Sequence, residues 1–249
     1  MIETNKIFNG DCLEFMAQAS EPFADVSVTS PPYNLKQLGG RLGAKKKGYY
    51  ADNLKDVDYF QWVSSIIEAM LKVTKYHVFF NIQEVSGNRG IIRHILLNHY
   101  DKLKETFVWA KTNPPSMGFK EHDTMLSRGF EYIFCFSHDK PETSKFTYCN
   151  FSQCNGDYVK TSLISAVSQG YPGHNCVFPE HIPSFFIKNF SKENDVIYDP
   201  FMGSGTTAIA AHNLGRRWIG SEISSEYVEL ANLRLEPYLA QASLFTIGD

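Results

Sequence analysis

Short apolar runs alternate with helix-like patterns along most of the chain. The runs that favour β-strands are residues 25–30, 77–82, 105–110, 131–137, 195–199 and 217–222. The segments that favour helices are residues 58–75, 90–99, 180–190, 206–214 and about 225–238. Strands that alternate with helices form mostly parallel sheets, so the pattern predicts an α/β fold with helices on both faces of the sheet.

One helix and one strand illustrate how clear the local signals are. In residues 58–75, Tyr59, Val63, Ile66 and Met70 follow the three- and four-residue spacing that places apolar side chains on one helix face. The strand at 25–30 is followed by two prolines, which cannot donate to a sheet ladder. We therefore expect the strand to end just before them.

Residues 139–175 break this rhythm. They show little periodicity and contain many polar and turn-forming residues. A stretch of this length is too long for a simple connection, and long irregular loops in compact domains are usually functional or mobile. We therefore expect an inserted irregular segment here.

Length and composition indicate an ordinary folded protein. The 249 residues suit one large domain, or one domain with a small insertion, and the 43% of hydrophobic residues are enough for a core. We find no apolar run of the ~18 residues needed to span a bilayer and no secretory signal at the N-terminus. These features predict a cytoplasmic protein without a membrane partner.

The cysteines and histidines suggest neither disulfides nor a metal site. The five cysteines are odd in number and form no CxxC pair, so reduced thiols are expected. The eight histidines are scattered without ligand spacing, and we predict no metal.

The net charge of −3 bears on possible partners. A protein that binds nucleic acid over most of its surface is normally basic. Any nucleic-acid role must therefore depend on a local basic patch.

The densest chemical signal is the sequence DPFMGSGTT at residues 199–207, which follows a strand and opens a helix. Gly203 and Gly205 allow a tight turn and close approach of a ligand, because neither carries a Cβ atom. The next strand ends in Glu222, where an acid is placed to bind the hydroxyls of a ribose. The pattern indicates a nucleoside-containing cofactor, although the dinucleotide signature GxGxxG is absent.

A second signal, Thr-Ser-Pro-Pro-Tyr, stands at the end of the strand at 25–30. Pro31 and Pro32 hold the backbone rigid, and Tyr33 presents an aromatic ring at the carboxyl edge of the sheet, where open α/β sheets bind ligands. For a flipped nucleobase, Tyr33 can stack on the ring while Ser30 and the Pro31 carbonyl accept hydrogen bonds from an exocyclic amine. Such contacts favour attack of the amine on an electrophilic methyl group.

Together these motifs strongly resemble those of DNA amino-methyltransferases that use S-adenosylmethionine. The motif TSPPY is similar to the family's catalytic motif, and DPFMGSGTT to its cofactor motif. The catalytic motif comes first here, which is the order of the beta subgroup. The resemblance implies a circularly permuted, Rossmann-like methyltransferase sheet of seven strands with helices on both faces.

The resemblance also assigns residues to S-adenosylmethionine, which it implies as the cofactor. The segment NGDCLEFM resembles the part of the family whose acid lies near the cofactor adenine, and FPEHIPSFFIKNF resembles the helix over its methionine end. The cofactor-binding residues predicted in this way are Asp11, Cys12, Phe178, Asp199, Pro200, Phe201, Gly203, Ser204, Gly205, Thr206, Thr207, Glu222 and Ile223. The predicted catalytic residues are Ser30, Pro31, Pro32 and Tyr33.

The first residue of the catalytic tetrad bears on the target base. In this subgroup Asp usually accompanies adenine N6 and Ser usually accompanies cytosine N4, so Ser30 favours cytosine. The physical link is partial, because a neutral hydroxyl is a weaker acceptor than a carboxylate. Adenine N6 methylation, a catalytically silent DNA-binding relative, and an RNA or small-molecule amine substrate stay open as alternatives.

A basic, glycine-rich stretch directly follows the catalytic motif and is our candidate for contact with double-stranded DNA. We assign residues 34–57 to a DNA-contacting loop and residues 139–175 to target recognition within a single catalytic domain, 1–249. Basic side chains supply phosphate contacts, and tyrosines can stack on bases. The predicted DNA-binding residues are Asn34, Arg41, Lys45, Lys46, Lys47, Tyr49 and Lys111.

The resemblance also suggests a biological setting. We expect the modification enzyme of a restriction–modification system in the cytoplasm of a bacterial, archaeal or phage host cell. Its partner would be a restriction endonuclease that acts on the same site, and the enzyme would be a monomer or a homodimer.

Overall fold

One mixed sheet of eight strands organises the described part of the chain, with the order β1-β10-β9-β2-β3-β5-β4-β6. The computed structural model describes residues 2–35, 53–113, 129–151, 161–167, 169–171 and 174–245. The strands of the sheet are β1 (Lys6–Asn9), β2 (Ala24–Thr29), β3 (Thr74–Ile82), β4 (Leu103–Lys111), β5 (Phe130–Ser137), β6 (Leu163–Ala166), β9 (Val196–Asp199) and β10 (Arg217–Glu222). A separate antiparallel pair contains β7 (Gln169–Tyr171) and β8 (His174–Val177).

Every strand of the sheet except β5 runs in the same direction. β5 is antiparallel to both of its neighbours, β3 and β4, and the other pairs are parallel. The C-terminal ends of the parallel strands therefore meet the N-terminal end of β5 at one edge of the sheet, which we call the carboxyl edge. The prediction of a mostly parallel α/β sheet is confirmed.

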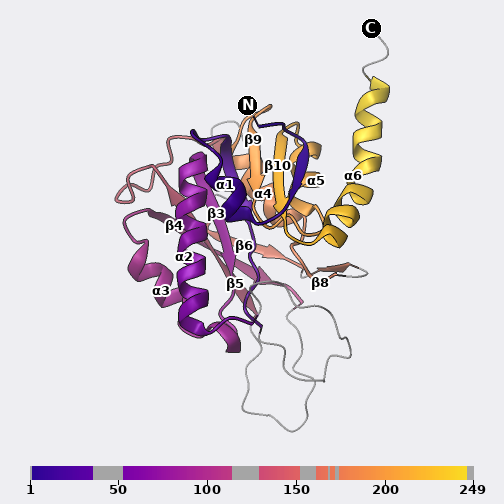
Figure 1. Ribbon diagram of the computed structural model, residues 1–249. Helices are drawn as coiled ribbons and strands as arrows, with labels where there is room; N and C mark the ends of the chain where they lie inside the picture. Colours follow the sequence, from indigo (N-terminus) through magenta and orange to yellow (C-terminus); the bar gives the residue numbers. More distant parts are fainter. Residues whose placement is uncertain are drawn as a thin grey trace.

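Helices cover both faces of this sheet (Figure 1). The helices are α1 (Cys12–Ala17), α2 (Asp56–Val73), α3 (Ile91–Asn98), α4 (His181–Phe190), α5 (Thr206–Asn213) and α6 (Ser225–Phe245), with a short 3₁₀ turn, η1 (Ser86–Asn88). The first three helices pack on one face, and the last three pack on the other. Figure 1 shows the C-terminal part of α6 extending away from the sheet.

The alternation of side chains along the strands supplies both layers of the core. In β3, Phe79 packs with α4 on one face, while Val78 and Phe80 pack with α2 and α3 on the other. Phe79 stacks on Phe186 of α4 with a distance of 4.2 Å between ring centroids. This double burial is why the strands read as continuous apolar runs rather than as alternating ones.

The sheet has eight strands rather than the seven that the resemblance implied. The additional strand, β6, pairs with β4 at the end of the sheet and comes from the segment expected to be irregular. The pair β7 and β8 comes from the same segment. The prediction of an irregular segment over 139–175 is therefore wrong where β6, β7 and the start of β8 lie. β6 forms by pairing with the distant strand β4, and β7 and β8 pair with each other.

Residues 139–151 lie at the opposite, amino edge of the sheet. The main-chain oxygen of Tyr148 lies 3.0 Å from Nε2 of His77, near the start of β3. Nζ of Lys104, near the start of β4, donates to the Lys140 oxygen at 2.6 Å. The Asn150 N–H donates to the Asn189 oxygen in the last turn of α4. These contacts hold this part of the predicted recognition segment away from the carboxyl edge.

The predicted loop at 34–57 is described only at its two ends. Helix α2 begins at Asp56, within the predicted loop. Arg41, Lys45, Lys46, Lys47 and Tyr49 lie outside the described residues.

We predict that His77 makes folding stability depend on pH in the acid range. Burial lowers the pKa of His77 from 6.5 to about 4. Between these values the unfolded chain binds a proton that the folded protein does not, so the stability contributed at neutral pH is lost as the pH falls from 6.5 to 4. The loss should approach about 3 kcal/mol at roughly 1.4 kcal/mol per pH unit.

Denaturant unfolding of wild type and His77→Gln from pH 4 to 7 measures this effect. The stability difference between the two proteins should change with pH, whereas the exposed His181→Gln control should follow wild type. Parallel curves for wild type and His77→Gln would contradict the prediction.

Candidate active site

The turn that carries the Ser-Pro-Pro-Tyr tetrad leaves β2 at the carboxyl edge. Pro31 is buried, and the Pro32 oxygen accepts a hydrogen bond of 2.7 Å from the hydroxyl of Tyr59 in α2. Tyr59 itself is fully buried. The rigid dipeptide is therefore anchored to the helix that covers this face of the sheet.

Asn34 completes the turn and is an internal residue. It adopts the left-handed conformation, with φ of 57°, which asparagine tolerates better than most residues. Its Nδ2 donates to the Leu54 and Gly87 oxygens, and its Oδ1 accepts from the Leu54 N–H. Because Asn34 is fully buried, its position does not support the predicted DNA contact.

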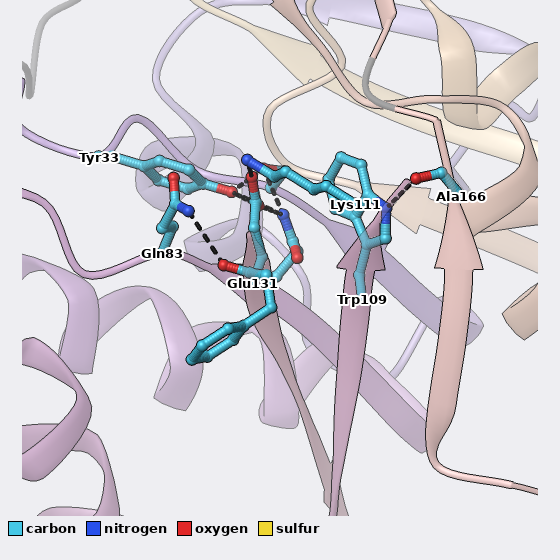
Figure 2. Close-up of polar contacts among 9 residues, drawn as sticks. Tyr33, Gln83, Trp109, Lys111, Glu131 and Ala166 are labelled. Atoms are coloured by element: carbon cyan, nitrogen blue, oxygen red, sulfur yellow. Dashed lines mark hydrogen bonds and ion pairs between the residues drawn. The ribbon is translucent and has the colours of Figure 1, made fainter. Parts of the chain in front are cut away.

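The hydroxyl of Tyr33 lies in a compact polar cluster (Figure 2). It donates to Oε2 of Glu131 in β5 at 2.6 Å and lies 3.0 Å from Oγ of Ser30. Nδ2 of Asn81, in β3, lies 2.6 Å from the same hydroxyl, 2.7 Å from Glu131 Oε2 and 3.2 Å from Ser30 Oγ. Burial, and then the nearby Glu131, raise the pKa of Tyr33 well above its ordinary value, so Tyr33 remains a phenol at neutral pH.

Lys111, at the end of β4, supplies the positive charge of this cluster. Its Nζ lies 2.7 Å from Oε1 of Glu131, and both side chains are more than nine-tenths buried. The same Nζ lies 5.3 Å from the centre of the Trp109 ring. The prediction that Lys111 contacts DNA is therefore not supported, because its ammonium group is used inside the protein.

The turn at residues 199–207 lies beside this cluster at the same edge, since β9 neighbours β2 in the sheet. Asp199 Oδ1 accepts from Thr29 Oγ1 at 2.6 Å and from the Phe201 N–H at 3.0 Å, and Oδ2 accepts from Thr207 Oγ1 at 2.6 Å. Burial raises the pKa of Asp199 to about 6 against the opposing effect of these donors, so the carboxylate is ionised at neutral pH. Because Thr29 directly precedes Ser30, this carboxylate connects the two predicted motifs.

The glycines of the turn have different physical roles. Gly203 and Gly205 both have positive φ, at 52° and 85°. The Gly203 N–H donates to Glu222 Oε2 at 2.9 Å. A Cβ atom on Gly205 would lie 3.1 Å from Cβ of Ala231 in α6. Gly205 is therefore required for the backbone angle and for close packing of α6.

Other predicted cofactor residues surround this turn. Glu222 Oε1 accepts from the Ser224 N–H at 2.9 Å, and the Glu222 main-chain oxygen accepts from the Gly10 N–H at 3.0 Å. The latter bond brings the start of α1 next to the end of β10. Asp11 caps α1 by accepting from the Leu13 and Glu14 N–H groups.

The remaining predicted residues differ in exposure. Cys12 is buried, and burial raises its thiol pKa to about 12. Ile223 is 46% exposed, while Phe178 and Phe201 are half-buried. The Pro200 oxygen accepts from Ser221 Oγ at 3.2 Å. The structure thus joins the turn at 199–207 to Glu222 by a hydrogen bond. Ile223 follows Glu222 in the chain, and Asp11 follows Gly10, whose N–H binds the Glu222 main-chain oxygen.

Sequence reasoning missed three residues that hold the site together. Asn81 and Glu131 complete the Tyr33 cluster, and Arg234 of α6 donates to the oxygen and hydroxyl of Ser204. Each stands next to apolar or ordinary helical sequence, so no local motif marked it. A polar residue at the end of an otherwise apolar strand, as at Asn81 and Glu131, was the available signal.

Comparison with known proteins supports the family that the sequence motifs resemble. A family model described as DNA methylase, N6/N4 type, matches residues 24–233. The chain belongs to the N6/N4 DNA methylase family. The type II methyltransferase M.HinfI of Haemophilus influenzae is 30% identical over 251 residues, covering 93% of this chain and 68% of the relative.

Solved structures agree with this family fold. The cytosine-N4-specific PvuII DNA methyltransferase superposes with a TM-score of 0.72 at 21% identity, covering 94% of this chain and 87% of the other. The M1.HpyAVI–SAM complex gives 0.63 at 20% identity, covering 92% and 98%. At these identities the likeness establishes the shared fold.

Metal sites and membrane-spanning helices are two further classes of feature. Within the described ranges of this DNA methylase, no group of three or more His, Cys, Asp or Glu side chains is arranged to hold a metal ion. In the same ranges, no helix combines the length and apolar character needed to cross a membrane.

We predict that Gly205→Ala destabilises the methylase more than Gly215→Ala does. Both glycines have positive φ, a conformation that costs a residue with a side chain about 1–3 kcal/mol. At Gly215 the new methyl group would meet only the flexible Glu193 side chain, at 3.4 Å, whereas at Gly205 it would crowd Ala231. Thermal or urea unfolding of both variants measures the difference, and equal losses would show that packing against α6 is not the constraint.

Proposed function

We propose that this DNA methylase transfers a methyl group from S-adenosylmethionine to the N4 amine of cytosine in duplex DNA, with the target base flipped out of the helix. The observation that carries the proposal is the Asp199–Thr29 hydrogen bond of 2.6 Å. It places the serine–tyrosine catalytic turn directly beside the glycine turn, so a base and a cofactor can meet at the carboxyl edge. Sites at this edge are the rule in open α/β sheets.

The residues present fit S-adenosylmethionine. The turn around Gly203 leaves backbone close to a ligand, and Glu222 ends the neighbouring strand where an acid can bind ribose hydroxyls. Asp11 and the exposed Ile223 lie next to Glu222 and suit the adenine end, while Phe178 suits the methionine end. The cofactor supplies an electrophilic methyl group. A solved relative of the same fold, M1.HpyAVI, is described as a complex with this compound.

The catalytic turn fits an exocyclic amine. Ser30 Oγ and the Pro31 carbonyl can accept its two N–H bonds, and the ring of Tyr33, whose hydroxyl is anchored, can stack on the base. In the transfer the amine nitrogen would form a bond to the methyl carbon, for which the bound cofactor would supply the methyl group and keep the electron pair of the broken bond. A proton would then leave the nitrogen for solvent. No covalent enzyme intermediate is needed.

The positions of the cysteines support an amine target over carbon methylation, because a cytosine C5 enzyme would need a Pro-Cys nucleophile and none of the five cysteines follows a proline. A cytosine C5 enzyme requires a thiolate nucleophile, and burial raises the thiol pKa of Cys12 to about 12 and that of Cys135 well above its ordinary value. Both are therefore neutral thiols. Ser30, in place of an acid, favours cytosine over adenine, and adenine N6 methylation is the second candidate.

We extend the proposal to the setting of the enzyme. The basic residues Arg41, Lys45, Lys46 and Lys47, with Tyr49, would contact the DNA backbone and bases, and target recognition would involve the segment from β6 to β8. A cognate restriction endonuclease would act on the same site in the cytoplasm of the host cell, with the methylase acting as a monomer or homodimer. M.HinfI, a type II methyltransferase, supports this setting.

Nucleoside mass spectrometry of DNA from cells that express the protein tests the reaction. We expect N4-methylcytosine that is absent from cells with the empty vector. Detection of N6-methyladenine alone would show that the target is adenine and not cytosine. Absence of both, together with no transfer of labelled methyl groups to varied duplex DNA, would favour a silent binder.

We predict that Tyr33→Ala lowers the methyl-transfer rate at least about 100-fold, because the target base is then no longer held in the geometry that the reaction needs. The affinity for S-adenosylmethionine should change less than about threefold. Single-turnover kinetics and calorimetry measure the two quantities. The exposed Tyr100→Ala variant, remote from the site, serves as the control and should match wild type. Equal loss of both quantities in Tyr33→Ala would show a structural role for the tyrosine.

A further inference from the structure

We propose that the buried Lys111–Glu131 ion pair is a positioning device that sets the direction of the hydrogen bonds from Ser30 through Tyr33 to Glu131. In this direction the Ser30 oxygen presents a lone pair to the amine of the substrate. The inference deepens the proposed methyl transfer and rests on it. None of the three residues Asn81, Lys111 and Glu131 needs to touch the substrate in order to act in this way.

The geometry gives the chain of contacts. Lys111 Nζ lies 2.7 Å from Glu131 Oε1, Glu131 Oε2 lies 2.6 Å from the Tyr33 hydroxyl, and that hydroxyl lies 3.0 Å from Ser30 Oγ. Figure 2 shows Tyr33, Glu131 and Lys111 converging from three elements. These contacts therefore form one continuous chain, from the Lys111–Glu131 ion pair through Tyr33 to the predicted catalytic serine.

The charges decide which way each bond points. A carboxylate in an ion pair only accepts hydrogen bonds, and Glu131 forms such a pair with the Lys111 ammonium group at 2.7 Å. At 2.6 Å from Glu131, Tyr33 must therefore donate its proton to the carboxylate. The opposite orientation would bring two acceptor oxygens into contact in a buried site, which is costly. The Tyr33 oxygen is consequently an acceptor, and Ser30 donates to it.

Asn81 enforces the same direction from the other side. Its Nδ2 faces Ser30 Oγ, Tyr33 Oη and Glu131 Oε2, and only the donating end of the amide suits a carboxylate. Ser30 thus gives its proton to Tyr33 and accepts from Asn81. In the described part of the chain Ser30 Oγ has no further hydrogen bond, so its second lone pair can accept an N–H from an exocyclic amine.

Trp109 holds Lys111 in place and connects it to β6. The Lys111 ammonium lies 5.3 Å from the Trp109 ring, and Trp109 Nε1 donates to the Ala166 oxygen at 3.1 Å. Figure 2 shows this contact between the two strands. The positioning device therefore joins the catalytic turn after β2 to the strands β3, β4, β5 and β6 at one edge of the sheet.

The substitution Glu131→Gln tests the direction of the bonds. A glutamine keeps the shape but can donate as well as accept, so the Tyr33 hydroxyl is free to reverse and Ser30 loses its fixed acceptor role. We expect the single-turnover methyl-transfer rate to fall about 10–100-fold, with affinities for S-adenosylmethionine and DNA within about threefold of wild type. A rate equal to that of wild type would overturn the inference.

A double-mutant cycle with Tyr33→Phe distinguishes positioning from a general structural role. Because Glu131 acts through the Tyr33 hydroxyl, Glu131→Gln should lower the rate less than about threefold in the Tyr33→Phe background. If Glu131→Gln lowers the rate by the same factor in both backgrounds, the two side chains act independently and the inference fails.

Two further variants separate this effect from loss of folding. The double variant Lys111→Met/Glu131→Gln removes both charges and so leaves no unpaired buried ion. It should melt as a folded protein but still transfer methyl groups slowly. A wild-type rate in this variant would overturn the inference. Lys75→Met removes the Lys75–Asp25 pair at the amino edge and is the matched control, with a wild-type rate expected. Absence of transfer by wild type itself would instead reject the proposed function.

Discussion

The site depends on the burial of one carboxylate, that of Asp199. The side chain is almost fully buried, and removing a charge from water is costly unless donors replace the water. Thr29 and Thr207 each donate to one of its oxygens, and the Phe201 N–H completes the set. Because Thr29 leads into the catalytic turn while Phe201 and Thr207 belong to the glycine turn, satisfying this one charge sets the relative position of the two turns.

A second buried carboxylate organises the other side of the site by the same logic. Glu131 is compensated by Lys111, Tyr33 and Asn81, which come from β4, the catalytic turn and β3. Because β5 runs antiparallel to its neighbours, its first residues reach the carboxyl edge where the parallel strands end. Because β5 is reversed, the acid at the carboxyl edge comes from the start of a strand. In an all-parallel sheet it would have to come from the end of one.

In the described residues, local patterns predicted five of the six α-helices and six of the eight strands of the main sheet, and missed α1, β1 and β6. They also failed where a residue's role depends on distant partners. Asn34 and Lys111 are predicted DNA contacts, but the polar groups of both side chains form bonds inside the protein. Residues 139–151 looked like part of a recognition segment, but His77 and Lys104 bind them to the amino edge. Strand β6 has no strong strand signal of its own and forms by pairing with β4.

By itself the sequence determined the alternating α/β pattern, the turn at Gly203 and Gly205, and the tetrad that ends β2, because these follow from short-range backbone and side-chain constraints. Only the tertiary structure decided that Thr29 and Asp199, 170 residues apart in the chain, share a hydrogen bond, and that Glu131 and Lys111 converge on Tyr33. The physical reason is strand order. Which strand ends become neighbours is set by the packing of the whole sheet between two layers of helices.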